Sequence, residues 1–171
     1  HIAYVHIPKT GGSFIRRHYG MFRSPPLGYA HGSLEDFRSP YTLSFCFIRE
    51  PYDWMFTLFT YVKYRNKKKP WKSFEKYDCY EDFILDNGFR YFYDEWKKGK
   101  QHEWAKDVDH VLIFENFLDD FNLFLKMYNF PPCHHRSKIN SFSKHEVQHQ
   151  RKIGEEASII LKEYLEEDVE F

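Results

Sequence analysis

Apolar residues gather in three short runs along the chain, and each run is followed by a segment with helical spacing. The runs that we predict to be strands cover residues 2–7, 42–48 and 108–114. The helices that we predict cover about 13–19, 33–37, 51–63, parts of 80–106, 115–128 and 144–166. Strands that alternate with helices in this way are typical of a parallel sheet covered by helices.

The pattern predicts an α/β protein with a P-loop-like three-layer fold, in which helices flank a central parallel sheet. The chain has 171 residues, so we expect residues 1–171 to form a single domain. In such sheets, ligands bind outside the carboxyl ends of the strands. Lys9, Arg49 and Glu115 all fall at these ends, which makes their surroundings the first candidates for a site.

The first of these turns is rich in glycine and carries a lysine. Residues 6–13 read HIPKTGGS and stand between the first strand and the first helix. Glycines let backbone N–H groups approach an oxyanion, a helix start adds partial positive charge, and lysine adds a full one. The Walker pattern places a glycine four residues before Gly-Lys-Ser/Thr, whereas here the lysine precedes both glycines. The turn therefore predicts a phosphate-like ligand other than ATP or GTP.

The second turn carries an arginine at the end of an apolar strand. Residues 45–51 (FCFIREP) lead into a helix, and Thr57 follows about two helical turns after Arg49. We expect the Thr57 hydroxyl on the face that Arg49 uses, because a guanidinium with a hydroxyl makes a good phosphate clamp. The alternative is that Arg49 only pairs with Glu50 or Asp53 at the start of the helix.

Together, the two motifs resemble those of the sulfotransferase superfamily, in particular its carbohydrate branch (the heparan sulfate 2-O- and bacterial family 2 type). Three further segments match that branch in order: residues 30–37 around His31, residues 111–117 around Glu115, and the tail from Tyr164 to Phe171. The five matches cover nearly the whole chain.

The chain departs from the family pattern on the helix that follows Arg49. Trp54, Thr57 and Phe59 stand where many relatives have arginine, serine and tyrosine. Thr57 keeps a hydroxyl, so nucleotide binding is still expected. Trp54 removes one charge from the 3′-phosphate or acceptor side.

The resemblance implies an enzyme that transfers a sulfuryl group from 3′-phosphoadenylyl sulfate (PAPS) directly to a hydroxyl acceptor, typically on a carbohydrate. It implies that no metal is required. It also implies that Arg49 and Thr57 bind the 3′-phosphate. The residues implied to bind the 5′-phosphosulfate are Lys9, Thr10, Gly11, Gly12 and Ser13.

The same resemblance suggests two catalytic residues. Lys9 is expected to neutralise the charge that develops on the leaving group. His31 is expected to take the acceptor's proton, because the unperturbed pKa of histidine, about 6.5, suits a base near neutrality. Alternatively, His31 is an ordinary surface or core histidine, and weaker candidates for the base are Glu35, Asp36 and His6.

A late polar loop is the remaining candidate for nucleotide contacts. Arg136 and Asn140 belong to residues 134–143, which resemble a loop that closes over the nucleotide in relatives. The alternative for each residue is a solvated linker. We do not expect the Cys133-His134-His135 run to bind a metal, because adjacent side chains diverge and no second ligand pair has zinc spacing.

Composition limits the partners. Lys and Arg together number 25, as do Asp and Glu, so no overall field attracts nucleic acid. No apolar run is long enough to predict a membrane span. The basic and aromatic residues of 63–76 suit an anionic glycan, although a solvated loop is the alternative. From the resemblance we expect a cytoplasmic protein if it is bacterial or viral, and a Golgi one if an upstream anchor was trimmed.

Two other classes of function stay open on sequence grounds. A P-loop-type kinase is disfavoured, because no Walker glycine precedes Lys9 and no apolar strand ends in a convincing magnesium-binding aspartate. A nucleotide-binding module that has lost its transferase activity is disfavoured because both Lys9 and His31 are present. Binding and turnover measurements separate the three classes.

Overall fold

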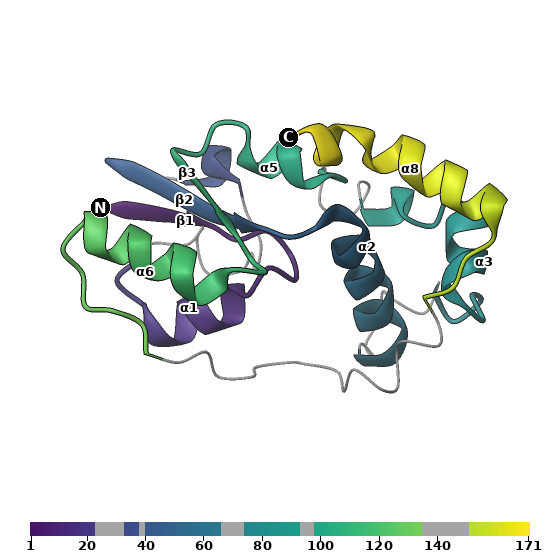
Figure 1. The fold of residues 1–171 in the computed structure, drawn as a ribbon, viewed down its shortest axis with the longest axis horizontal. Coiled ribbons are helices and arrows are strands. Elements are labelled where there is room, and N and C mark those ends of the chain that lie inside the picture. Colours follow the sequence, from purple (N-terminus) through teal and green to yellow (C-terminus); the bar gives the residue numbers. More distant parts are fainter. Residues whose placement is uncertain (23–32, 38–39, 66–73, 93–97, 135–150) are drawn as a thin grey trace. The chain divides into compact units, whose positions relative to one another are not determined.

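The computed structural model describes the chain except for residues 23–32, 38–39, 66–73, 93–97 and 135–150 (Figure 1). The chain forms two compact units. The first consists of His1–Glu50 with Trp104–Asn140, and the second of Pro51–Glu103 with Ser141–Phe171. The expectation of a single domain stays a prediction.

The first unit is built on a parallel sheet of three strands, β1 (Ile2–Val5), β2 (Leu43–Ile48) and β3 (His110–Ile113). Their order in the sheet is β1-β2-β3 (Figure 1). β2 lies in the middle and pairs with β1 through Val5 and Cys46, and with β3 through Cys46 and Val111. The predicted α/β class is therefore confirmed as a parallel three-stranded sheet flanked by helices, and the three predicted strands all form.

Aromatic side chains fill the space between this sheet and two helices, α1 (Gly12–His18) and α6 (Phe117–Met127). Phe45 and Phe47 alternate along β2, so both face the helices. The Phe45 ring centroid lies 4.5 Å from that of Phe124, and the Phe47 ring lies 4.5 Å from that of Phe117. Each fully buried side chain of this size contributes about 1.5–3 kcal/mol to the free energy of unfolding.

The alternate strand residues are buried as well. Ala3, Val5 and Cys46 have no solvent exposure, which is typical of a parallel sheet covered on both faces. Cys46, Cys79 and Cys133 are free thiols. Burial raises the pKa of the Cys46 thiol, so this cysteine is protonated and unreactive.

The second unit is helical and has its own aromatic core. It contains α2 (Pro51–Thr60), which continues into the π-helical turn η2 (Tyr61–Arg65), α3 (Tyr80–Leu85) and α8 (Glu155–Glu170). α8 contacts both α2 and α3. The short helix α5 (Gln101–Ala105) contains the point where the chain passes from the second unit to the first. A 3-10 turn, η1 (Leu34–Asp36), belongs to the first unit and matches the short helix predicted at 33–37.

The last helix is displaced from its predicted position, 144–166. α8 begins at Glu155 and ends at Glu170, and residues 151–153 are not helical. Gly154 is extended at the N-cap, and its N–H donates to the Glu81 carboxylate at 2.7 Å. Glu155 and Glu156 occupy the first turn, where negative charge is favoured by the helix dipole. The prediction that residues 151–154 are helical was wrong, because apolar periodicity does not reveal the N-cap at Gly154, after which the helix begins.

A polar contact locks β2 to the residue that precedes β3. The Asp109 carboxylate accepts the backbone N–H of Ser44 at 2.7 Å and its hydroxyl at 2.6 Å. The Asp109 N–H donates in turn to the Ser44 hydroxyl oxygen at 3.0 Å. The hydrogen bonds from Ser44 hold the pKa of Asp109 below its ordinary value.

We predict that Asp109→Asn lowers the free energy of unfolding at pH 7 by about 1 kcal/mol, the usual net value of such a hydrogen bond. Because the native pKa of Asp109 is lowered, its contribution is complete above the unfolded pKa of about 4 and is lost as pH falls through the native value. The difference between wild type and variant in urea unfolding should therefore shrink below pH 4. A difference that is constant from pH 7 to pH 3 would contradict this assignment; Asp107→Asn is the exposed control.

Candidate functional site

Three turns of the first unit meet at the carboxyl edge of the sheet. The turn with Lys9 follows β1, Arg49 follows β2, and Glu115 follows the end of β3. Because β1 and β3 both pair with β2 in parallel, these three residues leave the sheet on the same side. The Phe114 N–H continues the pairing and donates to the Ile48 carbonyl at 2.8 Å.

The Lys9 turn has an unusual backbone. Lys9 adopts a left-handed conformation with φ 65°, and Gly11 follows with φ 89°. A left-handed conformation costs a residue with a Cβ about 1–2 kcal/mol, and such strain is concentrated at functional sites. The Thr10 side chain is fully buried, and its hydroxyl donates to the Ile7 carbonyl at 2.8 Å. The Thr10 hydroxyl therefore supports the turn, and a contact of Thr10 with a phosphate stays a prediction.

The buried His6 side chain packs against the Lys9 turn. His6 is buried and stacks on Tyr4, with 5.8 Å between ring centroids. A Cβ placed on Gly12 would lie 1.9 Å from His6 Cδ2 and from His6 Nε2. The imidazole ring of His6 therefore leaves no room for a side chain at position 12, whether or not Gly12 also contacts a ligand. Sequence reasoning took both turn glycines as means of approaching an anion and did not find this constraint.

Phe114 connects the Lys9 turn to Arg49. A Cβ placed on Gly11 would lie 3.1 Å from the Phe114 ring. On the same aromatic residue, the Arg49 guanidinium carbon lies 5.1 Å from the ring centroid, within cation–π distance. Gly11 of the Lys9 turn and the Arg49 guanidinium therefore both lie beside the Phe114 ring. That the two motifs bind one ligand together stays a prediction.

Glu115 supplies the carboxylate beside Arg49. Its Oε1 lies 3.6 Å from Arg49 Nε, and its Oε2 accepts the Glu50 N–H at 3.3 Å. Asp53 forms an ion pair with Arg151. The alternative pairing of Arg49 with Glu50 or Asp53 stays a prediction. The Arg49 side chain keeps 21% of its surface exposed, so an anion can still reach it.

The remaining predicted residues are spread over both units. Ser13 is exposed at the start of α1, and its role in binding stays a prediction. Thr57 lies on α2 of the second unit, where its hydroxyl donates to the Asp53 carbonyl at 2.7 Å. Its sharing a face with Arg49 stays a prediction. The residues His31, Arg136 and Asn140 lie outside the described residues, so their roles also stay predictions.

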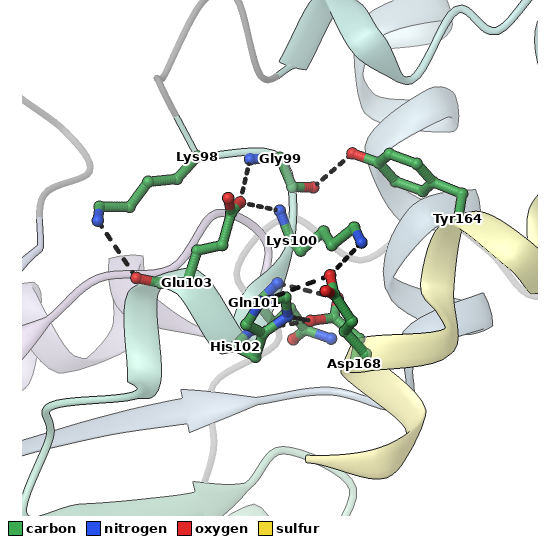
Figure 2. A network of polar contacts seen from close by, with 9 residues as sticks. Lys98, Gly99, Lys100, Gln101, His102, Glu103, Tyr164 and Asp168 are labelled. Atoms are coloured by element: carbon green, nitrogen blue, oxygen red, sulfur yellow. Dashed lines mark hydrogen bonds and ion pairs between the residues drawn. The ribbon is translucent and has the colours of Figure 1, made fainter.

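A polar network in the second unit was not predicted at all. Figure 2 shows the Asp168 carboxylate, whose side chain is fully buried, reaching the start of α5. It accepts the N–H of Gln101 at 2.9 Å and of His102 at 2.8 Å, and it lies 2.9 Å from His102 Nδ1. Asp168 belongs to the tail segment that carries the family resemblance.

Further hydrogen bonds hold residues 98–103 in place (Figure 2). The Glu103 carboxylate accepts the N–H groups of Gly99 and Lys100, and the Tyr164 hydroxyl donates to the Gly99 carbonyl at 3.0 Å. Apart from the contact with His102 Nδ1, these contacts satisfy backbone groups at or just before the start of α5. We therefore interpret the network as the attachment of α8 to α5, and not as a second catalytic site.

Within the described residues, no group of three or more His, Cys, Asp or Glu side chains is arranged to hold a metal ion. Cys133 is buried, and its backbone N–H and carbonyl both bond to the Asn122 side chain, at 2.6 and 3.0 Å.

No helix in the described ranges is long and apolar enough to cross a membrane.

Comparison with known proteins adds no assignment. No family model matches the chain, and no curated protein and no solved structure was found to match it. The family resemblance therefore stays a prediction, and function is inferred from the residues and their geometry.

We predict that Gly12→Ala lowers the free energy of unfolding by about 1–3 kcal/mol, the usual cost of overpacking. The cause is the clash with His6, so His6→Ala in the same chain should remove most of that loss. A double-mutant cycle measured by urea unfolding checks this. Gly20→Ala, which has open space around it, is the matched control. Additive effects of His6→Ala and Gly12→Ala would show that the ring is not the obstacle.

We predict that Lys9→Gly is more stable than Lys9→Ala by about 1 kcal/mol, because glycine adopts a φ of 65° without strain. Both variants lack the ammonium group, so both should lose anion affinity equally. Urea unfolding measures the first quantity and titration with inorganic sulfate the second. Equal stabilities of the two variants would show that the turn relaxes when the lysine is removed.

Proposed function

We propose that this chain is a sulfotransferase, which binds PAPS at the carboxyl edge of its sheet and transfers the sulfuryl group to a hydroxyl acceptor. One observation carries the proposal: the Lys9 turn and Arg49 follow adjacent parallel strands, and Gly11 of the turn and the Arg49 guanidinium lie beside the same Phe114 ring. PAPS and its product, adenosine 3′,5′-bisphosphate, carry two anionic groups on a single ribose. A protein that binds both groups needs two cationic sites close together at one edge.

The two cationic sites differ in a way that suits the two ends of this nucleotide. The Lys9 turn combines an ammonium group with the backbone N–H groups of a glycine-rich loop, which is typical of phosphate binding next to a reacting bond. Arg49 offers a planar guanidinium, which matches two oxygens of a terminal phosphate at once. We therefore assign the 5′-phosphosulfate to the Lys9 turn and the 3′-phosphate to Arg49.

The chemistry proposed is a direct in-line displacement at sulfur. The acceptor oxygen forms a new S–O bond while the bond from sulfur to the bridging oxygen breaks. The leaving group is adenosine 3′,5′-bisphosphate, and Lys9 with the turn N–H groups stabilises the negative charge that develops on it. The acceptor's proton passes to a base, for which His31 is the candidate. The acceptor class that we propose is a carbohydrate hydroxyl.

We predict that adenosine 3′,5′-bisphosphate at one hundred times its Kd stabilises the protein by about 2.7 kcal/mol. Lys9→Ala and Arg49→Ala should each weaken binding at least tenfold, because each removes a charged hydrogen-bond donor to phosphate. Thermal shift and calorimetric titration provide the measurements. Lys126→Ala and Arg17→Ala, at exposed positions, are the charge-matched controls. Unchanged affinity in both site variants would contradict the proposed site.

Two further experiments distinguish the proposed sulfotransferase from a kinase and from a nucleotide-binding module. Stabilisation by ATP with Mg²⁺, and none by the bisphosphate, would favour a kinase. Transfer of labelled sulfate from PAPS to a panel of glycans tests the reaction itself. His31→Ala should keep nucleotide affinity and lose turnover, as expected of a base. Binding of the bisphosphate without transfer to any acceptor would leave a nucleotide-binding module.

A further inference from the structure

We propose that Glu115 is a positioning residue, which orients the Arg49 guanidinium for the anion that this arginine binds. The inference rests on the proposed function and goes beyond it, because Glu115 itself touches no part of the nucleotide in this scheme. One carboxylate contacts both sides of the peptide at which the chain leaves β2: Oε1 contacts Arg49 Nε at 3.6 Å, and Oε2 accepts the Glu50 N–H at 3.3 Å.

Glu115 projects from a turn that is fixed on both sides. The Ile113 N–H donates to the Asp120 carboxylate at 2.8 Å, and the Phe114 N–H donates to the Ile48 carbonyl at 2.8 Å. After Glu115, the Phe117 N–H donates to the Phe114 carbonyl at 3.2 Å, as α6 begins. The carboxylate therefore comes from a rigid support, which is what a positioning group requires.

The contact with Arg49 is made at the nitrogen nearest to the main chain. The ion-pair contact at Nε, at 3.6 Å, and the Phe114 ring 5.1 Å from the guanidinium carbon restrict the guanidinium group from two sides. A phosphate that accepts from the two terminal nitrogens is compatible with this ion pair. Glu115 is thus placed to hold the arginine without occupying the position of its ligand.

Removing Glu115 has two opposite effects on anion affinity. Loss of a negative charge near the site strengthens anion binding, and salt screens this effect. Loss of orientation weakens binding, because a long side chain must then be ordered by the ligand, and salt does not change that cost. Measurements at high salt therefore isolate the positioning effect. Glu115→Gln is the informative variant, since its amide oxygen can still accept the Glu50 N–H.

The experiment compares adenosine 3′,5′-bisphosphate with adenosine 5′-monophosphate at high salt, so that the ratio of the two affinities reports the 3′-phosphate contact. In Glu115→Gln we expect this ratio to fall about three- to tenfold, with the affinity for the monophosphate unchanged. Asp119→Asn, at an exposed position of α6, the helix that follows Glu115, is the charge-matched control. Glu115→Gln should cause no further loss in an Arg49→Ala background. An unchanged ratio, or an equal loss without Arg49, would overturn the inference.

A spectroscopic measurement keeps this test separate from that of the proposed function. The Arg49 Nε–H resonance, assigned by its absence in Arg49→Ala, should shift and broaden in Glu115→Gln and stay unchanged in Asp119→Asn. If the wild type shows no preference for the bisphosphate but the resonance responds, the proposed function fails and the positioning contact stands. A resonance that does not respond to Glu115→Gln overturns the inference in either case.

Discussion

Parallel pairing of β1 with β2 is the constraint on which the candidate site depends. Two chain segments that are about forty residues apart reach the same edge only because Val5 pairs with Cys46 in a parallel register. The aromatic side chains of β2 fix that register, since a shift by one residue would move Phe45 and Phe47 off the face that α1 and α6 cover. Packing on one face of the sheet therefore determines that Lys9 and Arg49 follow their strands at the same edge.

Local patterning predicted most of the elements, and it was wrong where the decisive contact comes from far along the chain. Apolar strands and helical spacing indicated β1, β2, β3, α1 and α6 to within a few residues. The start of α8 depends on Gly154 and on its bond to Glu81, more than seventy residues earlier. The attachment of Asp168 to residues 101–102 is of the same kind, and no periodicity encodes it.

The candidate site shows the same division. Residue types and their place after strands predicted that the Lys9 turn and Arg49 would share one edge of the sheet, and Gly11 and Arg49 both lie beside Phe114 there. What the sequence pattern could not supply was the set of side chains that support them. Glu115, which follows the neighbouring strand β3, forms an ion pair with Arg49 and was not predicted from the sequence as its partner. Parallel topology thus brings a residue 66 positions away next to Arg49.

The Lys9 turn has too many supports to be a loop shaped by its ligand. The Thr10 hydroxyl holds the Ile7 carbonyl, His6 fills the space under Gly12, and Gly11 lies against Phe114. These contacts surround the one strained residue, Lys9, and a strained conformation persists only where the neighbouring structure determines it. The free-energy cost of the left-handed conformation at Lys9 is therefore already part of the folding free energy, before any anion binds. An anion that binds here meets donors already in place, which is the condition under which electrostatic stabilisation of a leaving group is most effective.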